Sequence, residues 1–176
     1  DLGHKMIADL ICNLLDTEYS YYKKLGAEKK PSLPEPFTAN RYEDAQRFQN
    51  YSCSPVMEGF EPDTHGAEQW SDPFKGGWIA HKQGSSIKFN VSGGIIMVQY
   101  RKTINKPAPV AYAVIDGDRQ NKVLLDANFD EDWGDLCCLE EIYSGAKGEH
   151  TVEIVIDTEG KENSDFMLIS VITANK

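Results

Sequence analysis

The segment GGWIAHKQGSSIKFNVSGGIIMVQYRKTINKPAPVAYAVI, residues 76–115, carries the clearest structural pattern in the chain. Apolar and polar residues alternate over 87–91, and this period of two predicts a strand with one buried and one solvated face. An apolar run, 95–100, predicts a second strand. Gly93 and Gly94 lie between the two, and we predict that they form a hairpin connection.

The chain beyond this segment also favours a β-fold. Asp116-Gly117 follows the alternating run 110–115 and predicts a tight hairpin, because both central positions of such a turn need positive φ. Further strand candidates lie at 123–125, 151–157 and 166–173, and no helices alternate with them. The predicted fold class is mainly β, an antiparallel β-sandwich or jelly roll with an N-terminal amphipathic helix.

Helical patterns occur only before the β-region. Residues 1–15 place apolar side chains at helical spacing, among them Ile7, Ile11 and Leu14. We expect this stripe to pack onto the β-region or onto a neighbouring chain, because it is too large to remain exposed. Residues 40–48 predict a second, short helix.

Composition limits the classes of partner. A chain of 176 residues, 40% of them hydrophobic, suffices for one domain with an ordinary core. The formal net charge of -10 argues against binding to nucleic acid or to an anionic membrane, since both draw on clusters of Lys and Arg. No apolar run approaches the roughly 20 residues of a membrane span. Neutral and cationic partners remain open.

The sequence lacks a recognisable set of catalytic residues. Its four histidines are scattered, and no Gly-x-Ser-x-Gly segment offers a nucleophile. The four cysteines lack the paired spacing of a zinc site, and the adjacent Cys137 and Cys138 would point to opposite faces of a strand. We therefore do not expect this chain by itself to be an enzyme.

An acidic segment, 126–135, could hold a cation. Asp126, Asn128 and Asp130 are spaced two apart, as oxygen ligands are in a calcium loop. The segment is not an EF-hand, because Glu131 stands where that loop needs glycine. A structural calcium ion and a solvated acidic loop both remain open, and no other cofactor is indicated.

Aromatic side chains are the candidates for ligand binding, because a sugar stacks its C–H face on an exposed ring while carboxylates bind its hydroxyls. Trp78 lies among apolar residues and is expected in the core. The candidate carbohydrate-binding residues are Trp133, Trp70, Asp132, Asp135 and Tyr112. The loop around Trp133 is the preferred site, because the strands on either side can hold it rigid.

Two parts of the chain resemble known families. The opening residues Asp1-Leu2-Gly3-His4-Lys5-Met6-Ile7-Ala8 resemble the end of the SGNH (GDSL-type) hydrolase domain, where such a segment opens the final helix. The β-region resembles the jelly-roll accessory domains of bacterial carbohydrate esterases, through Gly77-Trp78, residues 87–100 and Ala113-Val114-Ile115-Asp116-Gly117.

This resemblance implies a domain organisation and a function. Residues 1–18 would be the terminal helix of a preceding hydrolase domain, 19–38 a linker, and 39–176 a β-sandwich accessory domain. The accessory domain would be a non-catalytic carbohydrate-binding module that holds an attached catalytic domain on a polysaccharide of plant cell walls or bacteria, outside the cell or at its surface. Two alternatives remain open, a structural accessory domain that binds no glycan and the terminal part of an esterase whose β-domain shapes the active site.

Overall fold

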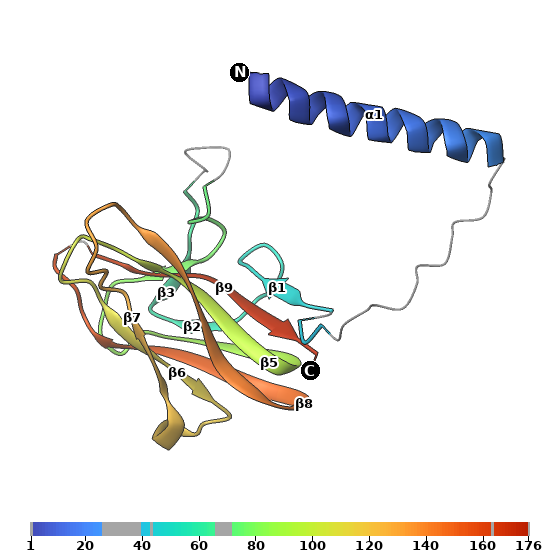
Figure 1. The fold of residues 1–176 in the computed structure, drawn as a ribbon. Coiled ribbons are helices and arrows are strands. Elements are labelled where there is room, and N and C mark those ends of the chain that lie inside the picture. Colours follow the sequence, from blue (N-terminus) through green and yellow to red (C-terminus); the bar gives the residue numbers. More distant parts are fainter. Residues whose placement is uncertain (1, 26–39, 43, 66–71, 163, 176) are drawn as a thin grey trace. The chain divides into compact units, whose positions relative to one another are not determined.

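The structure is a computed structural model that describes residues 2–25, 40–42, 44–65, 72–162 and 164–175. Its contacts divide the chain into two compact units, Asp1–Ala39 and Asn40–Lys176. Within the described residues, the first unit contains one helix and the second contains the strands (Figure 1).

Helix α1 spans Leu2–Leu25. The sequence has no glycine or proline between Gly3 and Gly26, so nothing interrupts the helix over this length. Lys23 and Lys24 lie in its last turn, where positive charge favours the helix dipole. The helix therefore continues ten residues past its predicted end and includes the first seven residues of the predicted linker. The remainder of that linker lies outside the described residues.

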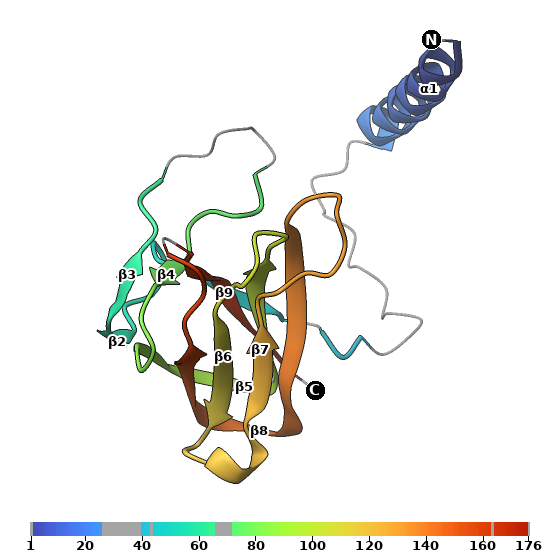
Figure 2. The ribbon, with the colours of Figure 1, turned by 90° about the vertical axis from the view of Figure 1, so that its left-hand side faces the viewer.

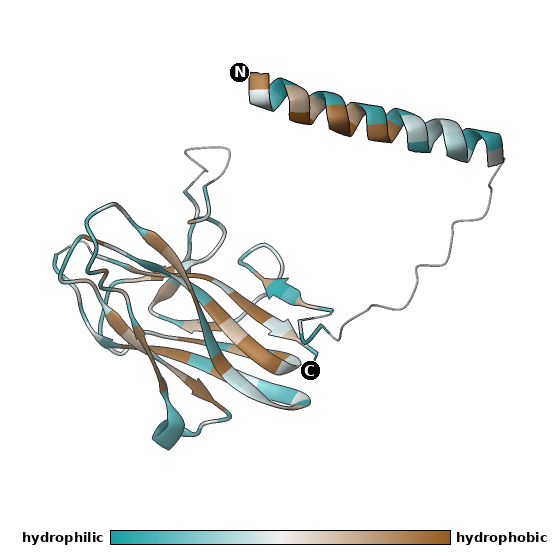
Figure 3. Ribbon diagram, in the orientation of Figure 1, coloured by the Kyte–Doolittle hydropathy of each residue, from teal (hydrophilic) through white to brown (hydrophobic). Residues whose placement is uncertain are grey.

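Apolar residues recur along α1, as the colouring of the ribbon in Figure 3 shows, and their side chains are exposed. They are Leu2, Met6, Ile7, Leu10, Ile11, Leu14 and Leu15. The expectation that this stripe packs against a partner stays a prediction. Among the helices that the structure describes, none combines the length and apolarity needed to cross a membrane.

The second unit is an antiparallel sheet of nine strands within the described residues. The strands are β1 (Gln46–Phe48), β2 (Val56–Glu58), β3 (Phe60–Pro62), β4 (Trp78–Ala80), β5 (Ser86–Lys102), β6 (Val110–Ile115), β7 (Val123–Asp126), β8 (Leu136–Thr158) and β9 (Phe166–Ala174).

Two long strands, β5 and β8, fold this sheet into two layers. The first half of β5 pairs with β2 and with the second half of β8, which pairs in turn with β6 and so with β7. The second half of β5 pairs with β9, which pairs with β1 and β4, and β4 pairs with β3. Figures 1 and 2 show β5 and β8 running side by side through the domain. The predicted antiparallel β-sandwich is confirmed.

The predicted hairpin at Gly93 and Gly94 is wrong, because both residues lie inside β5. Gly93 pairs with Gly148 and Ile95 with Ser144, so residues 145–147 of β8 form a bulge opposite Gly94. A Cβ atom on Gly93 would lie only 3.1 Å from the Thr173 Cβ. The glycines therefore mark the bend between the two layers, since a bulge turns a strand without ending it.

The predicted turn at Asp116-Gly117 is confirmed and β6 and β7 do form a hairpin, but its connection, residues 116–122, is longer than a two-residue turn. The two residues have φ values of 52° and 77°, and the Asp118 N–H donates to the Ile115 carbonyl at 2.9 Å. A short 3₁₀ turn, η1 (Arg119–Asn121), follows before β7 begins. Strands β6 and β7 then pair in antiparallel register.

The main core lies between the two layers. Trp78 is 1% exposed and meets Phe89 edge to face, with ring centroids 5.1 Å apart, which confirms its expected place in the core. Tyr100 stacks on Phe166 in the same cluster.

The short helix predicted for residues 40–48 is absent from the described part of that segment. Asn40 Oδ1 accepts a hydrogen bond from the Tyr42 N–H in a turn, and Asp44 has a φ of 56°, which a helix does not allow. Strand β1 then pairs with β9 from Gln46 on. Tertiary pairing with the sheet therefore overrides the local capping pattern.

Candidate binding cleft

A cleft of about 520 Å³ lies on the side of the β9 layer that faces away from the main core. Its floor includes Arg47 of β1, Gln99 of β5 and Cys137 of β8. Two loops, one through 49–51 and one that includes residues 63–65 and 72–76, form its walls. Clefts of roughly 300–1,000 Å³ are typical of small-ligand sites.

A chain of hydrogen bonds orients the polar floor. Arg47 Nε donates to Ser170 Oγ at 3.1 Å, and Ser170 Oγ donates to Gln99 Oε1 at 2.7 Å. Ser170 faces outward because β9 has an irregularity there: Gln99 pairs with Ser170 but Tyr100 pairs with Leu168, so Ile169 is an extra residue. Among the described residues, the terminal Arg47 nitrogens and Gln99 Nε2 have no hydrogen-bond partner.

The Cys137 thiol is a neutral part of this floor. Burial raises its pKa, and the opposing effect of the nearby Arg47 charge is smaller. Cys138 packs against the main core instead, so the two adjacent thiols face opposite sides of β8 as predicted. All four cysteines are free.

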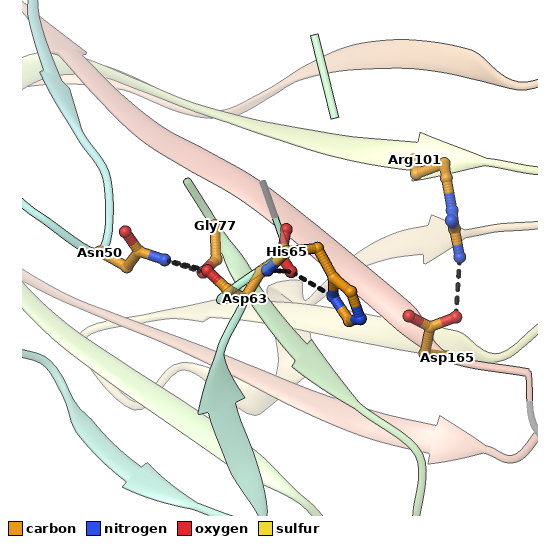
Figure 4. Close-up of polar contacts among 6 residues, drawn as sticks. All are labelled: Asn50, Asp63, His65, Gly77, Arg101 and Asp165. Atoms are coloured by element: carbon orange, nitrogen blue, oxygen red, sulfur yellow. Dashed lines mark hydrogen bonds and ion pairs between the residues drawn. The ribbon is translucent and has the colours of Figure 1, made fainter. Parts of the chain in front are cut away.

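Asn50 ties the two walls together, as Figure 4 shows. Its Nδ2 donates to the Asp63 carbonyl at 2.9 Å and to the Gly77 carbonyl at 2.8 Å. Its backbone N–H donates to the Gly76 carbonyl at 2.8 Å. One side chain and one backbone group thus hold loops that lie more than ten residues apart in the sequence, and the cleft is preorganised.

Gly77 lets this wall approach the sheet. A Cβ atom at this position would clash with the Leu168 carbonyl oxygen and lie 2.8 Å from the Ile169 Cα. Because both are backbone atoms of β9, they cannot move aside as a flexible side chain would. A residue larger than glycine would therefore displace the wall of the cleft.

His65 is held at the cleft by a buried carboxylate. Its Nδ1 lies 2.8 Å from Asp63 Oδ1, and its backbone N–H donates to the same oxygen at 3.0 Å. The Asp63 side chain is 2% exposed, whereas the His65 side chain is 84% exposed. An Nδ1–H donated to Asp63 leaves Nε2 as the ring nitrogen available to a ligand. Figure 4 shows this pair together with Arg101 and Asp165.

Tyr51 supplies an exposed aromatic ring on the other wall. It is 77% exposed, yet its hydroxyl donates to Gln49 Oε1 at 2.6 Å. Gln49 is 5% exposed and its Nε2 donates to the Lys75 carbonyl at 2.9 Å. A buried amide therefore fixes the position of a ring whose face is open to solvent.

The loop around Trp133 lies beyond the end of β7. Trp133 is 63% exposed and meets Phe129 edge to face, with centroids 5.0 Å apart. Asp132 is exposed as well. Asp135 lies 3.8 Å from Arg101 Nε, and Arg101 pairs through its backbone with Cys137 of the cleft floor. Arg101 also binds Asp165 at 2.8 Å, so one guanidinium connects this loop with the residue that precedes β9.

The predicted calcium ligands are engaged elsewhere. Asn128 Oδ1 accepts from the Ala108 N–H at 2.9 Å, and its Nδ2 donates to Asp126 Oδ1 at 2.6 Å. Asp130 pairs with Lys106, a bond that holds the pKa of this carboxyl below its usual range. Within the described ranges, no three His, Cys, Asp or Glu side chains gather as a possible metal site.

One further candidate residue, Tyr112, does not line the cleft. Tyr112 of β6 lies in the other layer, with Lys122 Nζ 3.5 Å from its ring centroid, so a cation covers the ring face that a sugar would need. Trp70 lies outside the described residues. Sequence reasoning missed Arg47, Gln49, Gln99 and His65. Arg47 and Gln99 meet only because β1 and β5 both pair with β9, and Gln49 and His65 lie in loops whose positions the sequence does not fix. The short Asp63-x-His65 spacing is the one local signal.

Neither a protein-family model nor a curated protein sequence matches the chain. Among solved structures, the chain is similar to a two-domain esterase (CEX) active on acetylated mannans, co-crystallised with mannopentaose, with 41% identity and a TM-score of 0.78. The match covers 100% of this chain and 47% of that one. A second structure of a two-domain esterase of this description matches at 40% identity with a TM-score of 0.79, covering 100% of this chain and 48% of that one.

A more distant match shows the fold alone. A family two carbohydrate esterase from Cellvibrio japonicus is 14% identical, with a TM-score of 0.54 over 76% of this chain and 34% of that one. The chain thus spans about half the length of the two-domain esterases that it matches. The predicted resemblance to an esterase-linked β-sandwich domain is confirmed.

Proposed function

We propose, on the basis of this likeness, that the chain is the carbohydrate-binding, non-catalytic part of a two-domain carbohydrate esterase, and that its ligand is a polysaccharide of the β-mannan type. One observation carries the proposal: the 41% identity extends along the whole chain to an esterase active on acetylated mannans. The β-sandwich would hold the attached catalytic domain on its polymeric substrate. We propose further that the protein acts outside the cell or at its surface, in a bacterium that degrades plant polysaccharide, because a polymeric substrate is met there.

The candidate residues for this binding are those that combine exposed aromatic surface with acidic oxygens. Trp133 is exposed, and Asp132 and Asp135 are its neighbours in the chain. Rings of this kind bind the C–H face of a sugar while carboxylates accept hydrogen bonds from its hydroxyls.

Affinity electrophoresis tests the proposal directly. The chain is run through gels that contain acetylated glucomannan, deacetylated glucomannan, xylan or polygalacturonate, with bovine serum albumin as the non-binding reference. We expect retardation by the two glucomannans. Mobility equal to the reference in all four gels would show that the chain binds none of these glycans. The chain alone should not hydrolyse aryl acetates, and turnover that persists through purification would refute the non-catalytic role.

The exposed apolar stripe of α1 supports a second role, attachment to the catalytic domain. Seven apolar side chains of this helix are exposed, a surface that water does not favour. We propose that α1 is the end of the preceding hydrolase domain and is covered by it in the longer protein. Light scattering and dye binding then distinguish two forms: the chain 1–176 should self-associate and bind the apolar dye ANS, whereas 40–176 should remain monomeric and bind little dye.

A further inference from the structure

The cleft between Arg47, Tyr51, His65 and Gln99 has the features of a built sugar site. These four residues come from β1, two loops and β5, and they have no local sequence motif in common.

The hydrogen-bonding groups of the cleft are fixed before any ligand arrives. Ser170 accepts from Arg47 Nε and donates to Gln99 Oε1, so both planar side chains are oriented while their outer nitrogens stay unpaired within the described structure. His65 is oriented in the same way by the buried Asp63. Planar groups with several polar atoms suit the adjacent hydroxyls of a sugar ring, which offer a donor and an acceptor at each oxygen.

An aromatic ring stands beside these groups. Tyr51 is 77% exposed, and its hydroxyl is already bonded to the buried Gln49. Holding the hydroxyl does not hide the ring face, which therefore remains free for contact with the C–H face of a sugar. A rigid ring loses little conformational freedom on binding, so the contact costs less than it would with a mobile side chain.

The charges around the cleft balance. Arg47 and Lys75 contribute two positive charges, and Asp63 and Asp72 contribute two negative ones. Asp63 is engaged with His65, and the Asp72 carboxylate accepts from the Phe74 N–H at 2.9 Å. A cleft with balanced charges favours a neutral ligand over an anionic one. Moving an anionic sugar out of water costs free energy, and the cleft has no excess positive charge to offset that cost.

We propose that this cleft binds one or two pyranose units of a neutral polysaccharide, with Tyr51 as the stacking platform and Arg47, Gln99 and His65 as the groups that bind hydroxyls. The proposal rests on the carbohydrate-binding function given above and assigns that function a place that is separate from the Trp133 loop. The cleft lies on a face of the sheet, and the hydrogen bonds of Asn50 hold its walls in place. The binding site is therefore already formed before a ligand binds.

Isothermal titration of the full chain with mannopentaose and with deacetylated glucomannan tests the site. The variants are Tyr51→Ala, His65→Ala, Trp133→Ala and Tyr112→Ala, the last being a matched tyrosine on the other layer whose ring Lys122 covers. Tyr51→Ala should weaken binding at least about tenfold and His65→Ala about threefold or more, whereas Tyr112→Ala should stay within twofold of the original chain. Far-UV circular dichroism and thermal melting verify that each variant folds.

Three other results would each overturn the assignment. If Tyr51→Ala and His65→Ala bind like the original chain while Trp133→Ala abolishes binding, the glycan site is the Trp133 loop and the proposed function stands without this cleft. If the original chain binds neither glycan, the proposed function fails together with the site. If polygalacturonate binds more tightly than glucomannan, the argument from charge is wrong. Hydroxyl-radical footprinting gives an independent readout, because glucomannan should protect Tyr51 and leave Tyr112 unchanged.

Discussion

Trp133 and Trp78 are expected to respond very differently to replacement by alanine. Trp133 is 63% exposed, so about a third of its surface is covered, and its ring meets Phe129 edge to face. A buried tryptophan removes roughly 150–250 Å² from water, and about a third of that is roughly 50–80 Å². At about 25 cal/mol per Å² the covered part is worth about 1–2 kcal/mol, and less once burial in the unfolded chain is subtracted.

Trp78 gives the matched comparison. It is 1% exposed and packs on Phe89, so Trp78→Ala should cost about 3–5 kcal/mol through lost burial and the cavity left behind. For a domain of this size, that difference corresponds to a melting temperature lowered by about 5 °C for Trp133→Ala and by more than about 10 °C for Trp78→Ala.

Urea denaturation followed by far-UV circular dichroism measures both values without relying on tryptophan fluorescence. Equal destabilisation by the two variants would refute the reasoning, because it would mean that Trp133 is a packing residue. A Trp133→Ala variant that loses no more than about 2 kcal/mol stays folded, so its effect on glycan binding can be interpreted.

Three further outcomes are expected. Gly77→Ala should destabilise the domain by about 2 kcal/mol or more in urea denaturation, because its Cβ would clash with backbone atoms of β9. Gly148→Ala is the control and should change stability much less, because its Cβ would meet only the His150 Nε2, at 3.6 Å. The Asp116 carboxylate accepts from His150 Nδ1 and from the Thr151 N–H, and these bonds hold its pKa below the ordinary value of 3.8. Because the pKa of Asp116 is lower in the folded state than in the unfolded state, these bonds stabilise the fold at pH values above 3.8, and this stabilisation is lost as the pH falls through the folded-state pKa. Asp116→Asn should therefore flatten the acidic part of a plot of stability against pH. An unchanged acidic part would contradict this role for Asp116. Deleting residues 1–39 should leave the melting temperature of the β-domain unchanged within about 2 °C, because the strands form a compact unit with their own core. A large decrease in the melting temperature would show that α1 contributes to that core.

The sequence alone determined the features that depend on neighbouring residues. Alternation over 87–91 predicted a buried strand face, and Asp116-Gly117 predicted a hairpin, because residue spacing and turn chemistry act locally. The exposure of Trp133, flanked by acidic residues, and the burial of Trp78, among apolar ones, also agree with their local composition.

Tertiary structure decided the features that depend on partners distant in the sequence. Gly93 and Gly94 have the local pattern of a turn, but the bulge in β8 and the close approach of Thr173 make them a bend within one strand. Residues 46–48 form a strand because β9 offers its edge. The cleft also depends on distant partners. Arg47, Gln99 and Ser170 become hydrogen-bonded neighbours only when β1, β5 and β9 pair. Arg47 and Gln99 are 52 positions apart and Gln99 and Ser170 are 71 positions apart, so no local sequence pattern relates them.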